Sequence, residues 1–336
     1  MKKHPLFVFL MALLLAACQG MARPAIATEH PATPQLSFPV TIAHKYGETT
    51  IAAKPERIVL VGLTEQDALL ALGVVPVATR EWWGERPGAI FEWAKDKLGD
   101  APLPVVLSSG ELNFEQIAGL RPDVIIGLYS GLTQEEYDNL SKIAPTVAQP
   151  AEYPDWSIPW QELTRKIGLI VGKRIEAEQL VADLEAKFDA VRKAHPEFKG
   201  KTAIVASAWG YPDSYWVYSS SDVRTQFLLT LGFNSSPVFD EVIGSTFGAS
   251  ISREKVNLLN DADVAIWFAD NDELSDPLYH QLKISQEGRN IVIKSEEPLA
   301  FAFSFNTVLS LPYVLDELVP QLAAAIDGDP ITIYSK

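Results

Sequence analysis

The chain has 336 residues, which is more than one typical domain needs and enough for two. Hydrophobic side chains make up 47% of it, which allows sizeable cores and excludes a disordered chain. The formal net charge of −15 argues against nucleic acid or an anionic lipid surface as the main partner, because both attract basic patches, and it fits a partner with a positive docking face.

The first 17 residues are typical of a bacterial export signal. Lys2 and Lys3 precede an apolar run over 6–17, which is too short to span a membrane comfortably. Small residues then lead directly to Cys18, the single cysteine of the chain, in an order that resembles a bacterial lipobox. The resemblance implies cleavage before Cys18 and attachment of a diacylglyceryl lipid to it. The alternative is an ordinary secretory signal in which Cys18 stands by chance.

Residues 18–37 predict a flexible tether, since they contain three prolines and little periodic apolar pattern. The body runs from about Phe38 to the C-terminus and needs no disulfide. We therefore expect an exported protein that is lipid-anchored on the outer face of the cytoplasmic membrane or in the periplasm.

Residues 38–159 alternate between strand and helix patterns. Short apolar runs predict strands at 58–61, 76–78, 105–107, 124–126 and 146–148. Helices are predicted at 64–72, 89–98, 114–120 and 133–143. Asn113 can cap the third helix, and Thr133 with Glu136 has the pattern of a capping box at the fourth. Such alternation predicts a mostly parallel sheet covered by helices on both faces.

Residues 160–195 carry apolar side chains at helical spacing and predict one long helix, or two in line, that ends before Pro196. Residues 196–336 then repeat the alternating pattern. Strands are predicted at 202–207, 217–218, 264–267 and 291–293, and helices at 226–231, 253–259 and 307–325. Gly232 ends the first of these helices, Ser252 can cap the second, and Pro312 is expected to kink the last. The fold class is therefore α/β, with two Rossmann-like lobes of mostly parallel sheets joined by one long interdomain helix.

The two lobes share one line of sequence, at 113–126 and 252–266. Each copy has a capped helix start with a glutamate, a short helix, an Asp turn and a buried strand. Together with the segment 54–73 and the long helix, this line resembles the helical-backbone, class III substrate-binding proteins of ABC importers for ferric siderophores, haem and cobalamin. The resemblance covers about residues 45–325. The segments 141–146, 219–224 and 231–233 favour the ferric-siderophore branch.

That resemblance implies a monomeric receptor, not an enzyme, which binds a ferric siderophore between its lobes and delivers it to a permease dimer. The glutamate of each lobe docks onto permease arginines in this family, and the matching residues are Glu115 and Glu254. A carboxylate in the first turn of a helix is favoured by the helix dipole, which agrees with both positions.

The loops between the lobes would line the ligand cleft, and a bulky ferric chelate needs aromatic walls with a few donors. We expect ligand contacts from Arg80, Trp82, Trp83, Arg86, Tyr129, Trp209, Tyr215, Arg224 and Phe247. Tyr129 and Asp270 stand about where catecholate-binding members have arginines, whereas Arg224 remains. We therefore expect a hydroxamate, mixed or citrate-like ferric chelate in preference to a tris-catecholate.

Three other functions stay open at this stage. A haem or cobalamin receptor of the same family is the nearest alternative, with Tyr129 as a candidate axial ligand of haem. A signalling or scaffold lipoprotein could use the same fold. An enzyme is disfavoured because the body has no Gly-rich phosphate loop, no Gly-x-Ser-x-Gly elbow and no cysteine nucleophile. The histidines are scattered, so no dedicated metal site or cofactor is expected.

Overall fold

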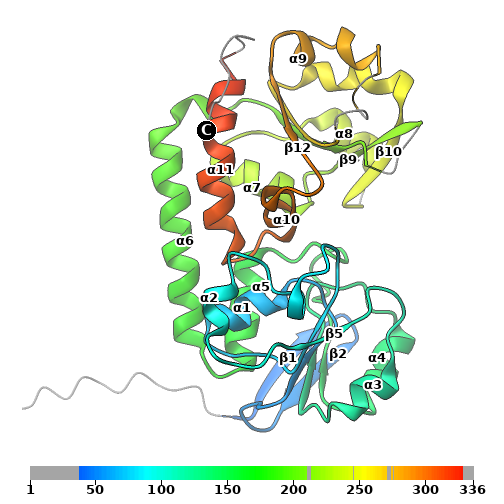
Figure 1. The fold of residues 1–336 in the computed structure, drawn as a ribbon, viewed down its shortest axis with the longest axis vertical. Coiled ribbons are helices and arrows are strands. Elements are labelled where there is room, and N and C mark those ends of the chain that lie inside the picture. The colour runs from blue at the N-terminus through cyan, green and yellow to red at the C-terminus, as the bar shows by residue number, and fades with distance from the viewer. Residues whose placement is uncertain (1–37, 210–212, 245, 271–273, 275, 328–336) are drawn as a thin grey trace, which may run out of the picture. The chain divides into compact units, whose positions relative to one another are not determined.

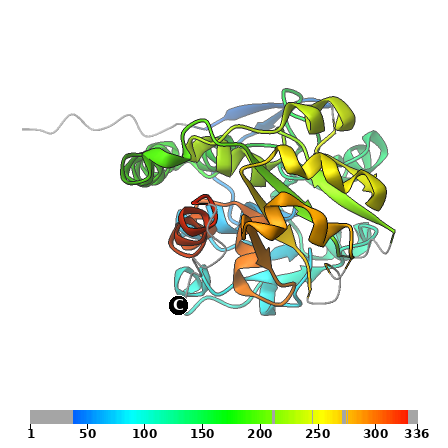
Figure 2. The ribbon, with the colours of Figure 1, turned by 90° about the horizontal axis from the view of Figure 1, so that it is seen from above.

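A computed structural model describes residues 38–209, 213–244, 246–270, 274 and 276–327. This part of the chain forms two α/β lobes. The long helix α6 (Arg174–Ala194) runs along one flank of both, and α11 (Ser310–Ala325) lies beside it next to the C-terminal lobe (Figures 1 and 2). The predicted export signal, the tether and Cys18 lie outside the described residues. The prediction of two α/β lobes is confirmed.

The N-terminal lobe contains a five-stranded sheet in the order β5-β4-β3-β6-β7, in which every pair is parallel. Its strands are β3 (Ile58–Leu60), β4 (Ala78–Arg80), β5 (Val105–Leu107), β6 (Val124–Ile126) and β7 (Thr146–Val147). Its helices are α1 (Glu65–Ala71), η1 (Pro87–Ala89), α2 (Lys95–Leu98), α3 (Phe114–Gly119) and α4 (Gln134–Ser141). The central strand β3 is wholly buried, as expected for a parallel sheet with both faces covered.

Local capping signals in this lobe are confirmed. The Asn113 side chain accepts a hydrogen bond from the Gln116 N–H at 2.9 Å at the start of α3. Thr133 and Glu136 form the reciprocal capping box of α4. The predicted helix 89–98 is wrong over most of its length, because only Ala89, at the end of η1, and the four residues of α2 are helical there. Instead, Ile90 and Ala94 are buried in one cluster with Leu70 of α1, and the buried Phe91 packs against Phe301 and Phe305 in the C-terminal part of the chain.

An antiparallel hairpin of β1 (Val40–His44) and β2 (Gly47–Ile51) precedes this sheet and has no counterpart among the predicted elements. Residues of β1 alternate between buried and exposed, which is the pattern of a strand with one face on a core. Thr49 anchors the hairpin, because its hydroxyl donates to the Thr146 carbonyl of β7 at 2.6 Å.

The C-terminal lobe has a mixed sheet in the order β10-β9-β8-β11-β12. Strands β8 (Ala203–Ser207), β11 (Val264–Phe268) and β12 (Asn290–Ile293) are parallel, whereas β9 (Ser214–Tyr218) and β10 (Gly248–Ser252) are antiparallel additions at one edge. The remaining elements are η2 (Pro196–Phe198), α7 (Val223–Leu231), α8 (Pro237–Ile243), η3 (Arg253–Asp261), η4 (Tyr279–Gln281) and α9 (Lys283–Gln286). Gly232 ends α7 in the left-handed conformation, as predicted. Ser252 precedes η3, but its side chain makes no capping hydrogen bond.

The predicted helix over 160–195 is two helices, and they are not in line. After α5 (Trp160–Ile170), Gly172 adopts a φ of +71°, and the chain turns back into α6. The two helices then pack closely, since a Cβ on Gly168 would lie 2.3 Å from the Cβ of Ala177. Therefore α6 alone is the long helix that spans both lobes, with α5 packed on α1 of the N-terminal lobe.

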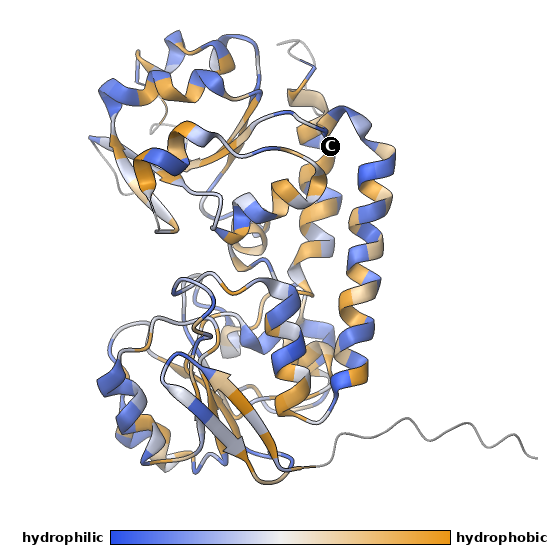
Figure 3. Cartoon of the chain, turned by 180° about the vertical axis from the view of Figure 1, so that it is seen from behind, coloured by the Kyte–Doolittle hydropathy of each residue, from blue (hydrophilic) through white to orange (hydrophobic). Residues whose placement is uncertain are grey.

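Two further helices end the described chain. The first, α10 (Pro298–Phe305), is almost wholly buried, and α11 follows it at a bend of 118°. Pro312 lies in the first turn of α11, where its missing N–H is tolerated, so the predicted kink there is wrong; Pro320 is the proline inside the helix. Figure 3 shows that α11 is mostly hydrophobic and α6 mixed, consistent with α11 lying deeper.

No single helix among the described residues is long and apolar enough to cross a membrane. The bent pair of α10 and α11 passes that test only when its two helices are taken together.

Candidate functional site

Two adjoining cavities of about 550 and 510 Å³ lie between the lobes and share Trp82, Tyr218 and Arg224. We call them together the interlobe cleft. The N-terminal lobe contributes Leu63, Arg80, Glu81, Trp82, Trp83, Ser109, Tyr129 and Trp156. The C-terminal lobe and α10 contribute Trp209, Trp216, Tyr218, Asp222, Arg224, Phe247, Phe268, Asp270, Ser295 and Ser304. Most of these follow the carboxyl ends of strands, where α/β folds bind their ligands.

Arg224 lies in the first turn of α7 and reaches the cleft from the C-terminal lobe. It is only 7% exposed, and its guanidinium donates to both oxygens of Asp222, at 2.7 and 2.6 Å. The guanidinium carbon also lies 3.9 Å from the ring centroid of Tyr218. Although burial alone would lower it, the Asp222 carboxylate raises the pKa of Arg224. The arginine is thus a fixed donor whose charge is largely balanced.

Arg80 ends β4 and lies on the opposite wall. Its guanidinium donates to the backbone carbonyl oxygens of Val61, Ser108, Ser109 and Gly110, at 2.8–3.4 Å. Burial lowers the pKa of Arg80. Because carbonyls orient the guanidinium without carrying a negative charge, Arg80 keeps a positive charge at the cleft.

The aromatic wall of the N-terminal lobe is a connected cluster. Trp82 packs edge-on against Trp83 at 4.7 Å between ring centroids and contacts Tyr129 at 6.2 Å. Behind them, Phe301 and Phe305 of α10 lie 4.9 Å from Trp83 and 5.0 Å from Trp82, respectively. Helix α10 therefore fixes the indole rings that face the ligand space.

On the C-terminal side, Trp209 packs on Phe268 at 5.0 Å, and its indole N–H is buried with no hydrogen-bond partner in the described structure. Phe247 contacts Trp216 at 5.7 Å. Asp270 accepts hydrogen bonds from the Ser295 N–H and hydroxyl at 3.1 and 2.8 Å. Aromatic faces and polar atoms thus converge from both lobes.

Trp156, Trp216 and Tyr218 are cleft residues that the sequence analysis did not select. Both tryptophans rest on a glycine: a Cβ on Gly131 would lie 2.7 Å from the Trp156 Nε1, and one on Gly248 would lie 2.5 Å from that of Trp216. An aromatic residue that faces a glycine across the fold leaves no signal in a single sequence.

Two of the expected ligand contacts lie elsewhere. Tyr215 is 0% exposed, packs against Trp267, and donates to Asp276 at 3.3 Å in the core of the C-terminal lobe. Arg86 lines neither cavity; its guanidinium carbon lies 5.1 Å from the Phe301 ring, and it pairs with Glu92 at 3.2 Å. We therefore withdraw both residues from the candidate site. The segment 210–212 beside Trp209 is outside the described residues.

Two buried carboxylates lie behind the N-terminal wall. Glu65 accepts from the Tyr129 N–H at 2.7 Å and the Thr64 N–H at 3.0 Å, and burial raises its pKa to about 7. Asp67 accepts from the indole of Trp93 at 2.7 Å and from the hydroxyl of Thr307, and burial raises its pKa to about 6. Glu65 thereby positions the loop that carries Tyr129.

The charge of the cleft lining is close to balanced. Among its described residues, the two arginines Arg80 and Arg224 face three carboxylates, those of Glu81, Asp222 and Asp270. No group of three or more His, Cys, Asp or Glu side chains that could hold a metal ion occurs in the described part of the chain. Such a cleft suits a large ligand of low net charge held mainly by aromatic contact.

The two candidate docking residues are both exposed, and each lies in the first helical turn of its own lobe. Glu115 is on α3, and Glu254 is on η3. Neither carboxylate makes a hydrogen bond or ion pair within the described structure.

Two lobes with a cleft at the strand ends and a helix spanning both are the architecture of a binding protein. The sequence model of the periplasmic binding protein family matches residues 58–295. The chain belongs to this family. Its members are binding proteins, not enzymes, so the predicted resemblance is confirmed at the level of the family.

Relatives and solved structures agree with this assignment. The ferric-anguibactin-binding protein FatB of Vibrio anguillarum is 26% identical over 302 residues, which cover 84% of this chain and 88% of FatB. A periplasmic solute binding protein of Mycobacterium smegmatis superposes with a TM-score of 0.75 at 36% identity, covering 86% of this chain and 99% of that one. PiaA of Streptococcus pneumoniae, in complex with ferrichrome, superposes with a TM-score of 0.74 at 30% identity, with the same coverage of both chains.

Proposed function

We propose that this protein is a lipid-anchored extracytoplasmic receptor that binds a ferric siderophore in the interlobe cleft and delivers it to an ABC importer permease. The observation that carries the proposal is the cleft itself, in which aromatic rings from both lobes surround two oriented arginines. The relatives support it, since FatB is named for ferric anguibactin and PiaA is complexed with ferrichrome.

The balanced charge of the cleft favours a hydroxamate, mixed or citrate-like ferric chelate over a tris-catecholate. A tris-catecholate complex is a highly charged anion and needs several cations that carry no internal counter-charge. Here Asp222 already occupies one bidentate edge of the Arg224 guanidinium, through Nε and Nη2, and so neutralises much of the charge that such a ligand would need. Asp270, Glu81 and Asp222 add negative charge to the same walls.

Haem is a weaker alternative for this cleft. Tyr129 is only 4% exposed, and burial raises the pKa of its phenol far above the usual range. That environment favours the neutral phenol, whereas an axial tyrosine ligand binds iron as the phenolate. We find no observation that favours cobalamin or a signalling role over a ferric chelate.

Tryptophan fluorescence of the purified protein tests the ligand class, because several indoles line the cleft. The titration would compare ferric hydroxamate, citrate and catecholate chelates with their iron-free forms, haemin and cobalamin. We expect saturable quenching by a ferric hydroxamate or citrate-like chelate and weaker quenching by the iron-free form. Saturation by haemin alone would replace the siderophore proposal with the haem alternative.

Permease docking is tested separately by iron uptake. The double variant Glu115→Gln/Glu254→Gln should abolish uptake and leave chelate affinity unchanged. Glu135→Gln is the matched control, since Glu135 is likewise exposed and lies in the first turn of α4. Normal uptake by the double variant would refute the docking role.

The lipid anchor rests on the sequence around Cys18. Replacement by Cys18→Ala should shift the protein from the membrane fraction to the soluble exported fraction, with unchanged affinity for the chelate. An unchanged membrane fraction would contradict lipidation at this cysteine.

A further inference from the structure

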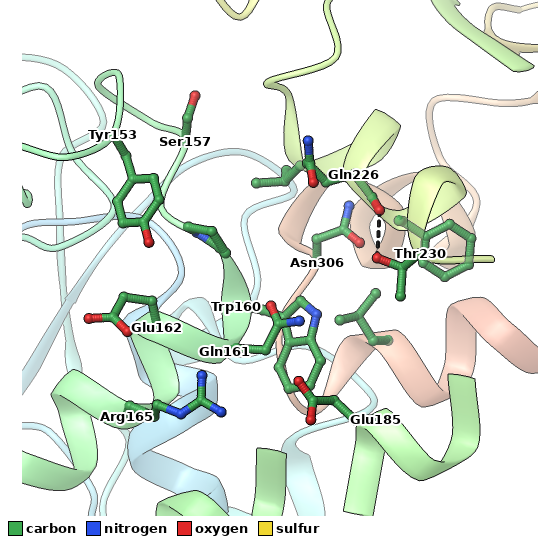
Figure 4. A pocket seen from close by; sticks show the side chains of 14 residues that line it. Tyr153, Ser157, Trp160, Gln161, Glu162, Arg165, Glu185, Gln226, Thr230 and Asn306 are labelled. Carbon is green, nitrogen blue, oxygen red and sulfur yellow. Dashed lines mark hydrogen bonds between the residues drawn. The ribbon is translucent and has the colours of Figure 1, made fainter. Parts of the chain in front are cut away.

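A second hollow, of about 330 Å³, lies between α5, α6 and α7 and shares no lining residue with the interlobe cleft. Figure 4 shows its walls: α5 contributes Trp160, Glu162 and Arg165, α6 contributes Glu185, and α7 contributes Gln226. Asn306, between α10 and α11, closes it on the inner side. Its volume lies at the lower end of the range for small-molecule sites.

Asn306 lines this hollow and carries an unsatisfied acceptor. The residue is 5% exposed and has a left-handed φ of +48° at the end of α10. Its amide nitrogen donates to the Phe303 carbonyl at 2.6 Å, which orients the amide, whereas its Oδ1 is buried without a hydrogen-bond partner in the described structure. A buried acceptor without a donor is unfavourable, so this position favours a ligand that brings an N–H group.

The charges at the hollow favour a cation. Glu185 is exposed at the rim, and no hydrogen bond or ion pair within the described residues engages it. Glu162 is partly neutralised by Lys166 at 3.3 Å. The one cation in the lining, Arg165, is paired with Glu178 at 3.0 Å, so its charge is balanced from outside the hollow.

An aromatic face completes the site. Trp160 begins α5, and its ring is stacked on Phe188 of α6 with an interplanar angle of 19°. Since Phe188 is buried and holds the indole in place, the edge and face that line the hollow are preorganised. Indole is the aromatic group that attracts ammonium and guanidinium ions most strongly.

We propose that this hollow is a second ligand site, for a small organic cation that carries an ammonium or guanidinium group. The cation donates a hydrogen bond to the Asn306 Oδ1, its charge is met by Glu185, and it packs against Trp160. This site goes beyond the proposed function and does not depend on what the interlobe cleft binds.

Isothermal titration of the purified full chain with agmatine, which carries both cationic groups, tests the proposal. We expect saturable binding, with γ-aminobutyrate and succinate at least about ten-fold weaker, because a carboxylate on the ligand would face Glu185 and Glu162. Glu185→Gln should weaken agmatine binding roughly two- to five-fold, as for an exposed ion pair. Asp183→Asn, which removes another exposed carboxylate of α6 that lies outside the hollow, should leave the affinity unchanged.

A second variant probes the buried acceptor. Asn306→Gly keeps a residue that tolerates the left-handed backbone and removes the amide, so agmatine affinity should fall about two- to ten-fold. The absence of saturable agmatine binding, tighter binding of succinate, or an affinity that neither Glu185→Gln nor Asn306→Gly changes would each overturn the proposal. If the wild-type protein bound agmatine but no ferric chelate, the second site would stand and the proposed function would fall. The two proposals can therefore be tested independently.

Discussion

The two lobes bury carboxylates in different ways. In the C-terminal lobe, Asp222 is paired with Arg224 at 2.6 Å and Asp276 with Arg253 at 3.4 Å. In the N-terminal lobe, Glu65 and Asp67 receive hydrogen bonds only from neutral N–H and O–H groups. The C-terminal lobe therefore balances its buried charge internally, whereas the N-terminal lobe holds carboxylates whose pKa values burial has raised.

The difference bears on the ligand. The ion pair with Asp222 lowers the net positive charge of the cleft, but it also holds the Arg224 guanidinium in one orientation. In the N-terminal lobe, the hydrogen bond from the Tyr129 N–H to Glu65 holds the loop that carries Tyr129. The position of that loop therefore depends on whether the Glu65 carboxyl group is protonated.

The largest change in stability is expected in the C-terminal lobe, where the buried carboxylates are paired with arginines. Arg224→Ala would leave Asp222, which is 1% exposed, without its counter-charge and should lower the free energy of unfolding by about 3–5 kcal/mol. Arg80→Ala is the matched change in the other lobe, where the lost partners are neutral carbonyls, and it should cost only about 1–2 kcal/mol. Urea unfolding of the two variants measures this. Equal losses would show that the two arginines are held in the same way.

The next effect is a pH dependence that belongs to the N-terminal lobe. Because the pKa of Glu65 is raised from 4.5 to about 7, the folded state binds the proton more tightly than the unfolded state. Its contribution to stability is therefore fully present below pH 4.5 and is lost as the pH rises through about 7. The shift corresponds to about 3 kcal/mol, with Asp67 acting in the same direction at lower pH.

Glu65→Gln removes this titration, so its free energy of unfolding should fall less between pH 5 and pH 7.5 than that of the wild type. The absolute stability of the variant is not the readout, since an amide N–H₂ in place of one oxygen faces a backbone donor. Glu135→Gln, at an exposed position, should keep the wild-type slope. An unchanged slope in Glu65→Gln would place the titrating group elsewhere.

A smaller effect comes from the glycine beside Glu65. A Cβ on Gly62 would lie 1.9 Å from a carboxylate oxygen of Glu65, so Gly62→Ala must displace that side chain and should cost about 1–3 kcal/mol. Gly119→Ala is the control, because nothing lies within 4 Å of its Cβ and the residue is helical. Thermal unfolding should show the control to be neutral or slightly stabilised. An unchanged unfolding temperature for Gly62→Ala would mean that the Glu65 side chain can adopt another conformation without loss of stability.

The smallest effect compares the glycines under the two cleft tryptophans. On Gly131, the three nearest atoms to a Cβ all belong to the Trp156 ring, so Gly131→Ala should move that ring and lower chelate affinity about ten-fold with little loss of stability. On Gly248, a Cβ would also lie 2.8 Å from the Val217 carbonyl oxygen. Gly248→Ala should therefore lower both affinity and the unfolding temperature. An affinity unchanged by either substitution would remove these tryptophans from the proposed site.

Much of the fold was predictable because its signals are local. The Asn113 cap, the Thr133–Glu136 capping box and the left-handed Gly232 each act within a few residues, and each is confirmed. The errors arose where distant contacts decided the conformation. The segment 89–98 packs its apolar side chains without a regular helix over most of its length. Helix α6 turns back onto α5 at Gly172, and Gly168 leaves room for Ala177 between them.

The candidate site was predicted in part. Arg80, Trp82, Trp83, Tyr129, Trp209, Arg224 and Phe247 all line the interlobe cleft, although their contact with a ligand stays a prediction. The prediction for Tyr215 was wrong because side chains along a strand alternate between its two faces. Within β9, the Tyr215 side chain points into the core, whereas those of Trp216 and Tyr218 face the cleft.

The α/β class, the two lobes and the family could be inferred from the chain alone, because periodicity, helix caps and a repeated line of residues are local features of its sequence. Which aromatic rings meet across the cleft, and which charges are balanced, could be seen only in the folded molecule. Those properties depend on atoms that are far apart in sequence, such as Asp67 and Thr307 or Gly248 and Trp216, and on the burial that folding imposes on them. In the sequence, Glu65 and Asp67 of α1 are indistinguishable from ordinary surface carboxylates. Folding removes both from water, and this burial raises their pKa values.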